Sequence, residues 1–261
     1  MLTVEELKQL ACESIDNRKK EIIEASKQIL SHPEAGFRET KTAALVAQKF
    51  KELGVAHESG LAITGLKGRI PGGAGAGPRV AVIGELDSLM VTEHPYADPV
   101  SGAAHACGHH CQIGMMLGTT IGLLTPEVLA QLSGEIVPFA VPAEEFIEVE
   151  QRLELRSQGK LEFMGGKAEL VRLGVFDDVD MCMLTHSSTN TAEGKLAVGS
   201  INNGAIAKEA RFLGVQAHAG SAPHRGINAL QAATLAMAAI NANRETFQDA
   251  DAIRVHPIIT K

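Results

Sequence analysis

The stretch that decides the fold is residues 79–87, which reads RVAVIGELD. It is a short, continuous apolar run, as expected for a strand that is buried on both faces of a parallel sheet. Two later runs have the same character, GEIVPFAVPAEE at 134–145 and VDMCMLTH at 179–186. Helical patterns at 111–124 and 166–174 separate the three runs. This strand–helix–strand alternation predicts an α/β fold with a mostly parallel sheet flanked by helices.

Each of the three runs ends in acidic or imidazole side chains. The groups at these ends are Glu85 and Asp87, then Glu144 and Glu145, and finally His186. Open α/β sheets bind ligands just beyond the carboxyl ends of their strands. One such strand end alone would mean little, but three of them together predict a binding site at that edge.

A dense group of soft ligands lies at residues 101–114, SGAAHACGHHCQIG. A buried cysteine and a hydrogen-bonded core histidine are the ordinary interpretation of Cys107 and His109. A structural zinc site would need a second ligand pair at finger-like spacing, and no C-x-x-C pair follows. A C-x-H pair combined with distant carboxylates better fits an open catalytic centre. We expect His105 to be a packing residue and Cys111 to lie in the core.

Composition excludes several classes of protein. The net charge is −7 and no Lys/Arg-rich run is present, which argues against nucleic acid as a partner. No apolar stretch approaches the ~20 residues of a membrane helix. The first 20 residues lack a signal-peptide pattern, so we expect a cytoplasmic protein whose four cysteines are reduced.

The amino-acid composition changes after His186. A polar, glycine-containing stretch at 188–204 is typical of a domain crossing. Beyond it, the patterns predict a strand at 205–214, an Ala-rich helix at 226–243 and a strand at 252–260. These elements indicate a small second α+β domain.

Several motifs, in order, resemble a known family. They are GELD, HACGHH, PAEE, TH and AHAGSAPHRGINAL. Together they are similar to the aminoacylase/carboxypeptidase G-like metallopeptidases, in particular the Cys-containing amidohydrolases that act on hippurate, indole-acetyl amino acids and aminobenzoyl-glutamate. The resemblance covers essentially the whole chain, and HACGH followed by PAEE is its most specific part. It implies a zinc-peptidase-like catalytic domain at 1–194 and an incomplete ferredoxin-like lid or dimerisation domain at 195–261.

The resemblance also implies roles for individual residues. The implied metal ligands are Cys107, which would bridge two ions, His109, Glu145 and His186. The implied catalytic residues are Glu144 as general base, Asp87 behind a ligating histidine, and His218 as the group that stabilises the oxyanion. The implied reaction is hydrolysis of the amide bond of an N-acyl amino acid or small peptide by a metal-activated water.

The implied cofactors are two divalent metal ions. A thiolate ligand favours zinc, with manganese, cobalt and nickel as alternatives. The implied partners are a small acyl-amino-acid or peptide substrate and a second copy of the chain, bound through the lid, with no nucleic acid and no membrane. His110 stands where this branch carries Asp or Asn. The chain ends at Lys261, whereas family members continue into a segment that supplies another histidine ligand. The alternative is therefore a catalytically impaired metal- or partner-binding fragment.

Overall fold

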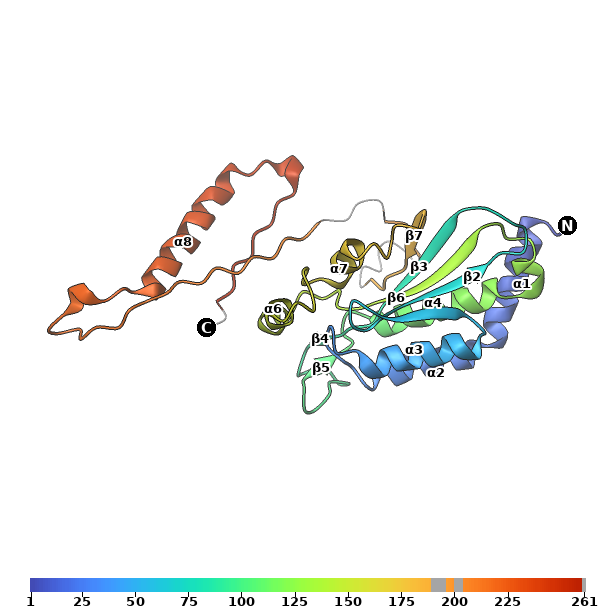
Figure 1. The fold of residues 1–261 in the computed structure, drawn as a ribbon, viewed down its shortest axis with the longest axis horizontal. Helices are drawn as coiled ribbons and strands as arrows, with labels where there is room; N and C mark the ends of the chain where they lie inside the picture. Colours follow the sequence, from blue (N-terminus) through green and yellow to red (C-terminus); the bar gives the residue numbers. More distant parts are fainter. Residues whose placement is uncertain (189–195, 200–203, 260–261) are drawn as a thin grey trace. The chain divides into compact units, whose positions relative to one another are not determined.

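A computed structural model describes residues 1–188, 196–199 and 204–259 of the chain. The chain divides into two compact units, Met1–Thr191 and Ala192–Lys261. The first unit contains the sheet and the helices that cover it (Figure 1).

In the first unit, the strands formed by the three apolar runs are separated by helices, as the sequence predicts. Its helices are α1 (Val4–Asn17), α2 (Lys19–Leu30), α3 (Thr40–Glu52), α4 (His109–Leu123), α5 (Pro126–Leu129), α6 (Val149–Ser157) and α7 (Gly166–Arg172). Its strands are β1 (Ala56–Leu61), β2 (Gly65–Pro71), β3 (Arg79–Glu85), β4 (Leu89–Met90), β5 (Ala103–Ala104), β6 (Glu135–Val141) and β7 (Met181–Leu184).

The central sheet has the strand order β1-β2-β6-β3-β7. The three apolar runs form its parallel part, in which β3 pairs with β6 on one side and with β7 on the other. At the opposite edge, β1 and β2 are antiparallel to their neighbours, so the sheet is mixed. The α/β class is confirmed.

Side chains of the central strands alternate between two apolar clusters, one on each face of the sheet. On one face, α4 packs against β3 and β6, and its residues Ile113 and Met116 lie in the core with Ile136. On the other face, Ile83 and Phe139 pack with Leu170 of α7, all three of them buried. Burial on both faces explains why these strands have continuous rather than alternating apolar patterns.

Residues 61–70 contain the turn and most of the second strand of a hairpin formed by β1 and β2. The chain reverses at Ala62 and Ile63, whose φ angles are 44° and 80°. Left-handed backbone at alanine and isoleucine is uncommon, and no Gly, Pro or Asn marks the turn itself. Gly60, with a φ of 79°, and Gly65 flank the reversal, but the turn residues themselves carry no such signal.

Strand β7 was predicted to be buried, and it is exposed. Met181, Met183 and Leu184 are 51%, 61% and 41% exposed. The strand pairs with β3 as expected, but it is an edge strand, and within the described ranges nothing pairs with its other side. An edge position removes the second neighbour that would bury these side chains.

The second unit contains α8 (Ala229–Asn243), which begins where the Asn228 side chain accepts the backbone N–H of Gln231 at 3.0 Å. The strands predicted at 205–214 and 252–260 are absent from the described part of those ranges. Among the described residues of the second unit, a single isolated bridge joins Val215 and Ile227, outside both ranges. An extended segment becomes a strand only when a neighbour pairs with its backbone. Among the described residues, no helix has the length and apolar character needed to cross a membrane.

Candidate metal centre

A tight turn before α4 sets Cys107 and His109 on either side of Gly108. Gly108 has a φ of 90°, and a Cβ at this position would lie 2.1 Å from the Oγ of Ser187. Only glycine meets both conditions, because it has no side chain and adopts positive φ without strain. The turn brings the segment after β7 into contact with the start of α4, and this contact assembles the site.

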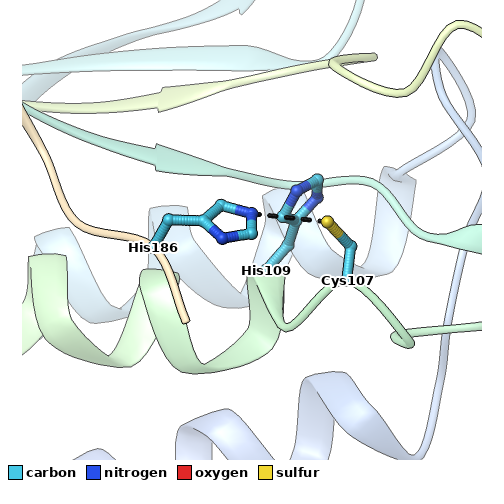
Figure 2. A group of neighbouring side chains, drawn as sticks. All are labelled: Cys107, His109 and His186. Atoms are coloured by element: carbon cyan, nitrogen blue, oxygen red, sulfur yellow. Dashed lines mark hydrogen bonds between the residues drawn. The ribbon is translucent and has the colours of Figure 1, made fainter. Parts of the chain in front are cut away.

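The first ligand group consists of Cys107, His109 and His186, whose ligand atoms all lie within 4.8 Å of one another (Figure 2). The Sγ of Cys107 is 3.3 Å from Nε2 of His186. Nδ1 of His186 lies 2.7 Å from the carbonyl oxygen of Ser187, so this nitrogen carries the proton that it donates. Nε2 then presents its lone pair toward the thiol.

The second ligand group consists of Glu85, His109 and Glu144, again within 4.8 Å of one another. Nε2 of His109 lies 3.0 Å from Glu85 and 3.9 Å from Glu144. His109 therefore belongs to both groups. Glu85 is 2% exposed and forms an ion pair with Lys167. The sequence placed Glu85 at the correct sheet edge but suggested no role for it.

Asp87 lies behind these ligands and is fully buried. Its carbonyl oxygen and its Oδ1 lie 2.9 Å and 3.3 Å from Nδ1 of His109. Its Oδ2 accepts the backbone N–H of Glu145 at 2.9 Å. One carboxylate thus contacts both the imidazole of α4 and the loop that carries the paired glutamates.

Charges around His109 shift the pKa values of the neighbouring groups. Burial disfavours the imidazolium, but the carboxylates of Asp87 and Glu85 outweigh it and raise the pKa of His109 to about 10. Burial also opposes ionisation of Glu85, yet His109 and Lys167 lower its pKa to about 2. Burial and the surrounding carboxylates raise the pKa of the Cys107 thiol to about 12.

Glu144 differs from these groups because it is half-buried at the rim of the site, with 38% of its side chain exposed. Burial, followed by the negative charge of Glu85, raises its pKa. A carboxylate with a raised pKa holds a proton more readily than an ordinary glutamate, as a general base and acid must.

The donor set fits a divalent metal ion. One thiol, two imidazoles and several carboxylates converge, and zinc prefers sulfur, nitrogen and carboxylate oxygen ligands. At the centre, Oε2 of Glu85, Oδ1 of Asp87 and Nε2 of His109 are buried and form no well-aligned hydrogen bond. The carboxylates contact His109 as ion pairs at 3.0 Å and 3.3 Å, and a bound cation would give these oxygens a better-aligned partner.

The other predicted residues fall in different places. The side chain of Glu145 belongs to neither ligand group, although its negative charge acts on Cys107. His218 lies in the second unit. His105 is buried, as predicted. The prediction of a core position for Cys111 is wrong, because its side chain is exposed. In the first turn of α4 only the inward face is covered.

The fold and the site define a class: an α/β protein with cysteine, histidine and carboxylate side chains gathered at the carboxyl edge of its sheet. Residues 201–253 match the peptidase dimerisation domain. Thermostable carboxypeptidase 1 of Saccharolobus solfataricus is 32% identical over 213 residues, which cover 79% of this chain and 49% of that protein. The N-acyl-L-amino acid amidohydrolase of Geobacillus stearothermophilus is 30% identical over 236 residues, covering 88% of this chain and 57% of that protein.

Solved structures show the same relationship. A putative aminohydrolase from methicillin-resistant Staphylococcus aureus is 27% identical, with a TM-score of 0.54 over 67% of this chain and 41% of that one. A dinuclear metal-binding peptidase of the M20 family from Bacillus subtilis shares the fold, with a TM-score of 0.53 at 24% identity over 66% of this chain and 44% of that one. The chain is similar in sequence to these carboxypeptidases and amidohydrolases, and it spans about half the length of the curated relatives it matches.

Proposed function

We propose that the protein hydrolyses the amide bond of an N-acyl amino acid or small peptide with metal-activated water. The observation that carries this proposal is His109, which is shared between a thiol–imidazole group and a carboxylate group at the ends of three parallel strands. The carboxypeptidase and amidohydrolase relatives support the reaction class. The ends of β3 and β6 contribute carboxylates and the end of β7 contributes an imidazole, and a hydrolytic metal centre uses these groups as ligands and as a base.

The residues of the site would have different roles in this reaction. We assign Cys107, His109, Glu145 and His186 as metal ligands, and Asp87 as the group that orients His109 through its Nδ1. Bound divalent ions would polarise the scissile carbonyl and lower the pKa of the attacking water. Glu144 would take the proton of that water and return it to the leaving amine.

His218 is the proposed donor to the developing oxyanion. Its Nδ1 accepts the backbone N–H groups of Gly220 and Ser221, both at 3.1 Å. Because Nδ1 is an acceptor, the proton of the neutral ring sits on Nε2. That N–H is the group that would stabilise negative charge on the substrate oxygen.

We further propose two ions in the site, with zinc favoured by the thiolate of Cys107 over manganese, cobalt or nickel. The M20 peptidase from Bacillus subtilis is described as dinuclear, which supports this number. A thiol ligand must stay reduced, so we assign the protein to the cytoplasm, where cysteines remain free.

The test of the reaction is Glu144→Gln. We expect this variant to bind as much zinc or manganese as the wild type and to lose nearly all hydrolysis of N-acyl amino acids and dipeptides. General acid–base groups typically contribute about 10²–10⁴-fold to the rate. Metal content and turnover are measured on the same preparations, with the exposed Glu58→Gln of β1 as the matched control.

Two outcomes would contradict the assignment. Wild-type turnover in Glu144→Gln would exclude Glu144 as the base. A wild-type chain that binds metal but hydrolyses no member of the substrate panel would identify a metal-binding protein without catalytic activity, not a hydrolase.

We propose that residues 195–261 form a lid and dimerisation domain, and that the protein is a homodimer. The match of residues 201–253 to the peptidase dimerisation domain supports this role. Leu230 and Leu235 of α8 are 66% and 73% exposed, as expected for a surface that a second copy would cover. Sedimentation should give twice the 27.6 kDa of one chain, and a monomer at micromolar concentration would overturn the proposal.

A further inference from the structure

The loop that carries the paired glutamates has a strained backbone. Strand β6 ends at Val141, and Ala143 has a φ of 48°, in the left-handed region that alanine rarely adopts. Glu144 and Glu145 follow directly. A strained conformation persists only where the surroundings hold it. The structure shows which groups hold this loop.

Glu39 holds the loop at one end. This side chain is fully buried, and its Oε1 accepts the backbone N–H of Ala143 at 2.8 Å. Its Oε2 accepts the hydroxyl of Thr64 at 2.6 Å. The carbonyl oxygen of Ala143 in turn accepts the N–H of Gly166 at 3.0 Å. Both backbone polar groups of Ala143 are therefore fixed.

Arg152 of α6 holds the other end. Its guanidinium donates from Nη2 to the carbonyl oxygen of Glu145 and from Nη1 to that of Met164, the latter at 2.7 Å. The guanidinium lies over the rings of Phe37 and Phe146, 5.4 Å and 5.5 Å from their centroids. These cation–π contacts restrict the position of the guanidinium and of its donors.

The space around Arg152 is closed. At Gly36, a Cβ would lie 2.6 Å from Nη2 of Arg152 and 2.9 Å from Cβ of Ala143. A glycine is thus needed where the arginine and the loop approach each other. The guanidinium of Arg152 is therefore packed closely against the loop.

Burial of the charged Arg152 side chain costs desolvation free energy. Its side chain is 1% exposed, and within the described ranges no carboxylate forms an ion pair with it. A buried charge without an ion partner costs desolvation free energy that no ion pair offsets. Stabilisation of the fold is therefore a poor explanation for the presence of this arginine. Its hydrogen bonds go instead to backbone carbonyls, one of which belongs to a glutamate of the site, and its charge faces Asp87, Glu39 and Glu145 at longer range.

We propose that Arg152 is a positioning residue for the metal centre. Arg152 donates to the carbonyl oxygen of Glu145, while Asp87 accepts the N–H of the same residue. Together these two hydrogen bonds would set the direction in which the side chains of Glu144 and Glu145 project. Arg152 would touch neither metal nor substrate. The proposal rests on the proposed metal site, but its main readout is metal affinity, which does not require hydrolysis.

The experiment compares three variants by calorimetric titration with Zn²⁺ and Mn²⁺, with circular dichroism as the test of folding. Arg152→Met keeps a long apolar side chain beside Phe37 and Phe146 and removes both donors. We expect it to bind metal about 10- to 100-fold more weakly, the loss typical for groups that orient ligands. Arg152→Lys keeps the charge without the planar fork, so we expect a smaller loss. Val46→Ala, in a buried position of α3, is the destabilised control and should bind metal normally.

Unchanged metal affinity in Arg152→Met would overturn the proposal. The proposal would also be overturned if Val46→Ala lost as much thermal stability and as much metal affinity as Arg152→Met. The loss of affinity would then be an effect of general destabilisation. If Arg152→Met does not fold, Arg152→Lys decides, and wild-type affinity in it refutes the positioning role. A wild type that binds metal without hydrolysis contradicts only the proposed reaction, whereas a wild type that binds neither ion contradicts both proposals.

Discussion

At the residue scale, His109 is the centre of the site because both of its ring nitrogens face acidic groups. Nδ1 faces Asp87, and Nε2 faces Glu85 and Glu144. The same imidazole also lies within 4.8 Å of the ligand atoms of Cys107 and His186, so it belongs to both candidate ligand groups. The motif HACGH indicated this histidine, but the carboxylates on both sides of it come from other segments of the chain.

Replacing Cys107 with serine should weaken metal binding by more than about 100-fold. Groups that merely orient ligands already contribute about 10- to 100-fold, and a ligand contributes more. Titration with Zn²⁺ measures the loss. Cys111→Ser is the matched control, because this exposed thiol lies one helical turn away and should leave the affinity unchanged. Equal affinities for the two variants would rule out Cys107 as a ligand.

At the element scale, a charged network secures the segment between α7 and β7, which leads to His186. Asp178 pairs with Lys67 and Arg69 of β2. Lys67 is 3% exposed, and it also donates to the carbonyl oxygen of Val175. The network ties an edge strand with few buried side chains to the antiparallel side of the sheet.

Asp178→Asn should destabilise the protein at neutral pH by about 1–3 kcal/mol, because a buried ammonium loses its charged partner. Burial opposes ionisation of Asp178, but hydrogen bonds from Lys67 and Arg69 outweigh it and lower its pKa from 3.8 to about 2. A lowered carboxylate pKa contributes stability above the ordinary value, and this contribution disappears as the pH falls through the folded value.

Urea unfolding of the wild type and of Asp178→Asn between pH 7 and pH 2 measures the difference. The two unfolding free energies should converge as the pH falls from about 4 to about 2. Asp16→Asn on the exposed face of α1 is the control and should show no such difference. A gap between wild type and Asp178→Asn that persists at pH 2 would assign the effect to packing instead of charge.

At the scale of the whole molecule, the first unit does not need a metal to form its core. Apolar clusters cover both faces of the central sheet, and the ligand residues lie beyond the ends of the strands. A structural zinc domain would be organised around the ion instead. The arrangement therefore favours a functional rather than a structural role for the metal.

Chelation should lower the melting temperature without unfolding the chain. A ligand present at 100 times its Kd adds about 2.7 kcal/mol to the stability of the folded state, and a chelator removes that contribution. Far-ultraviolet circular dichroism should show the same helix and strand content before and after chelation. A coil spectrum in chelator would instead identify a metal that holds the fold together.

The α/β class, the parallel strands β3, β6 and β7, and the acidic and imidazole groups at their ends were predictable from the sequence, because each depends on local apolar runs and their boundaries. The turn at Ala62, the exposure of β7 and the outward position of Cys111 were not. Each of these depends on which neighbour packs against a segment, and no local pattern encodes the neighbour.

The same contrast applies to the site. Motifs predicted five residues of the site, because their spacing and order along the chain are visible in the sequence: Cys107, His109, Glu144, Glu145 and His186. The two ligand groups of the structure include all of these except the side chain of Glu145. The part played by Glu85, the strained backbone at Ala143 and the buried Arg152 behind it became apparent only when the chain was folded. These features arise where segments distant in sequence meet, and the cost of burying a charge can be judged only once its surroundings are known.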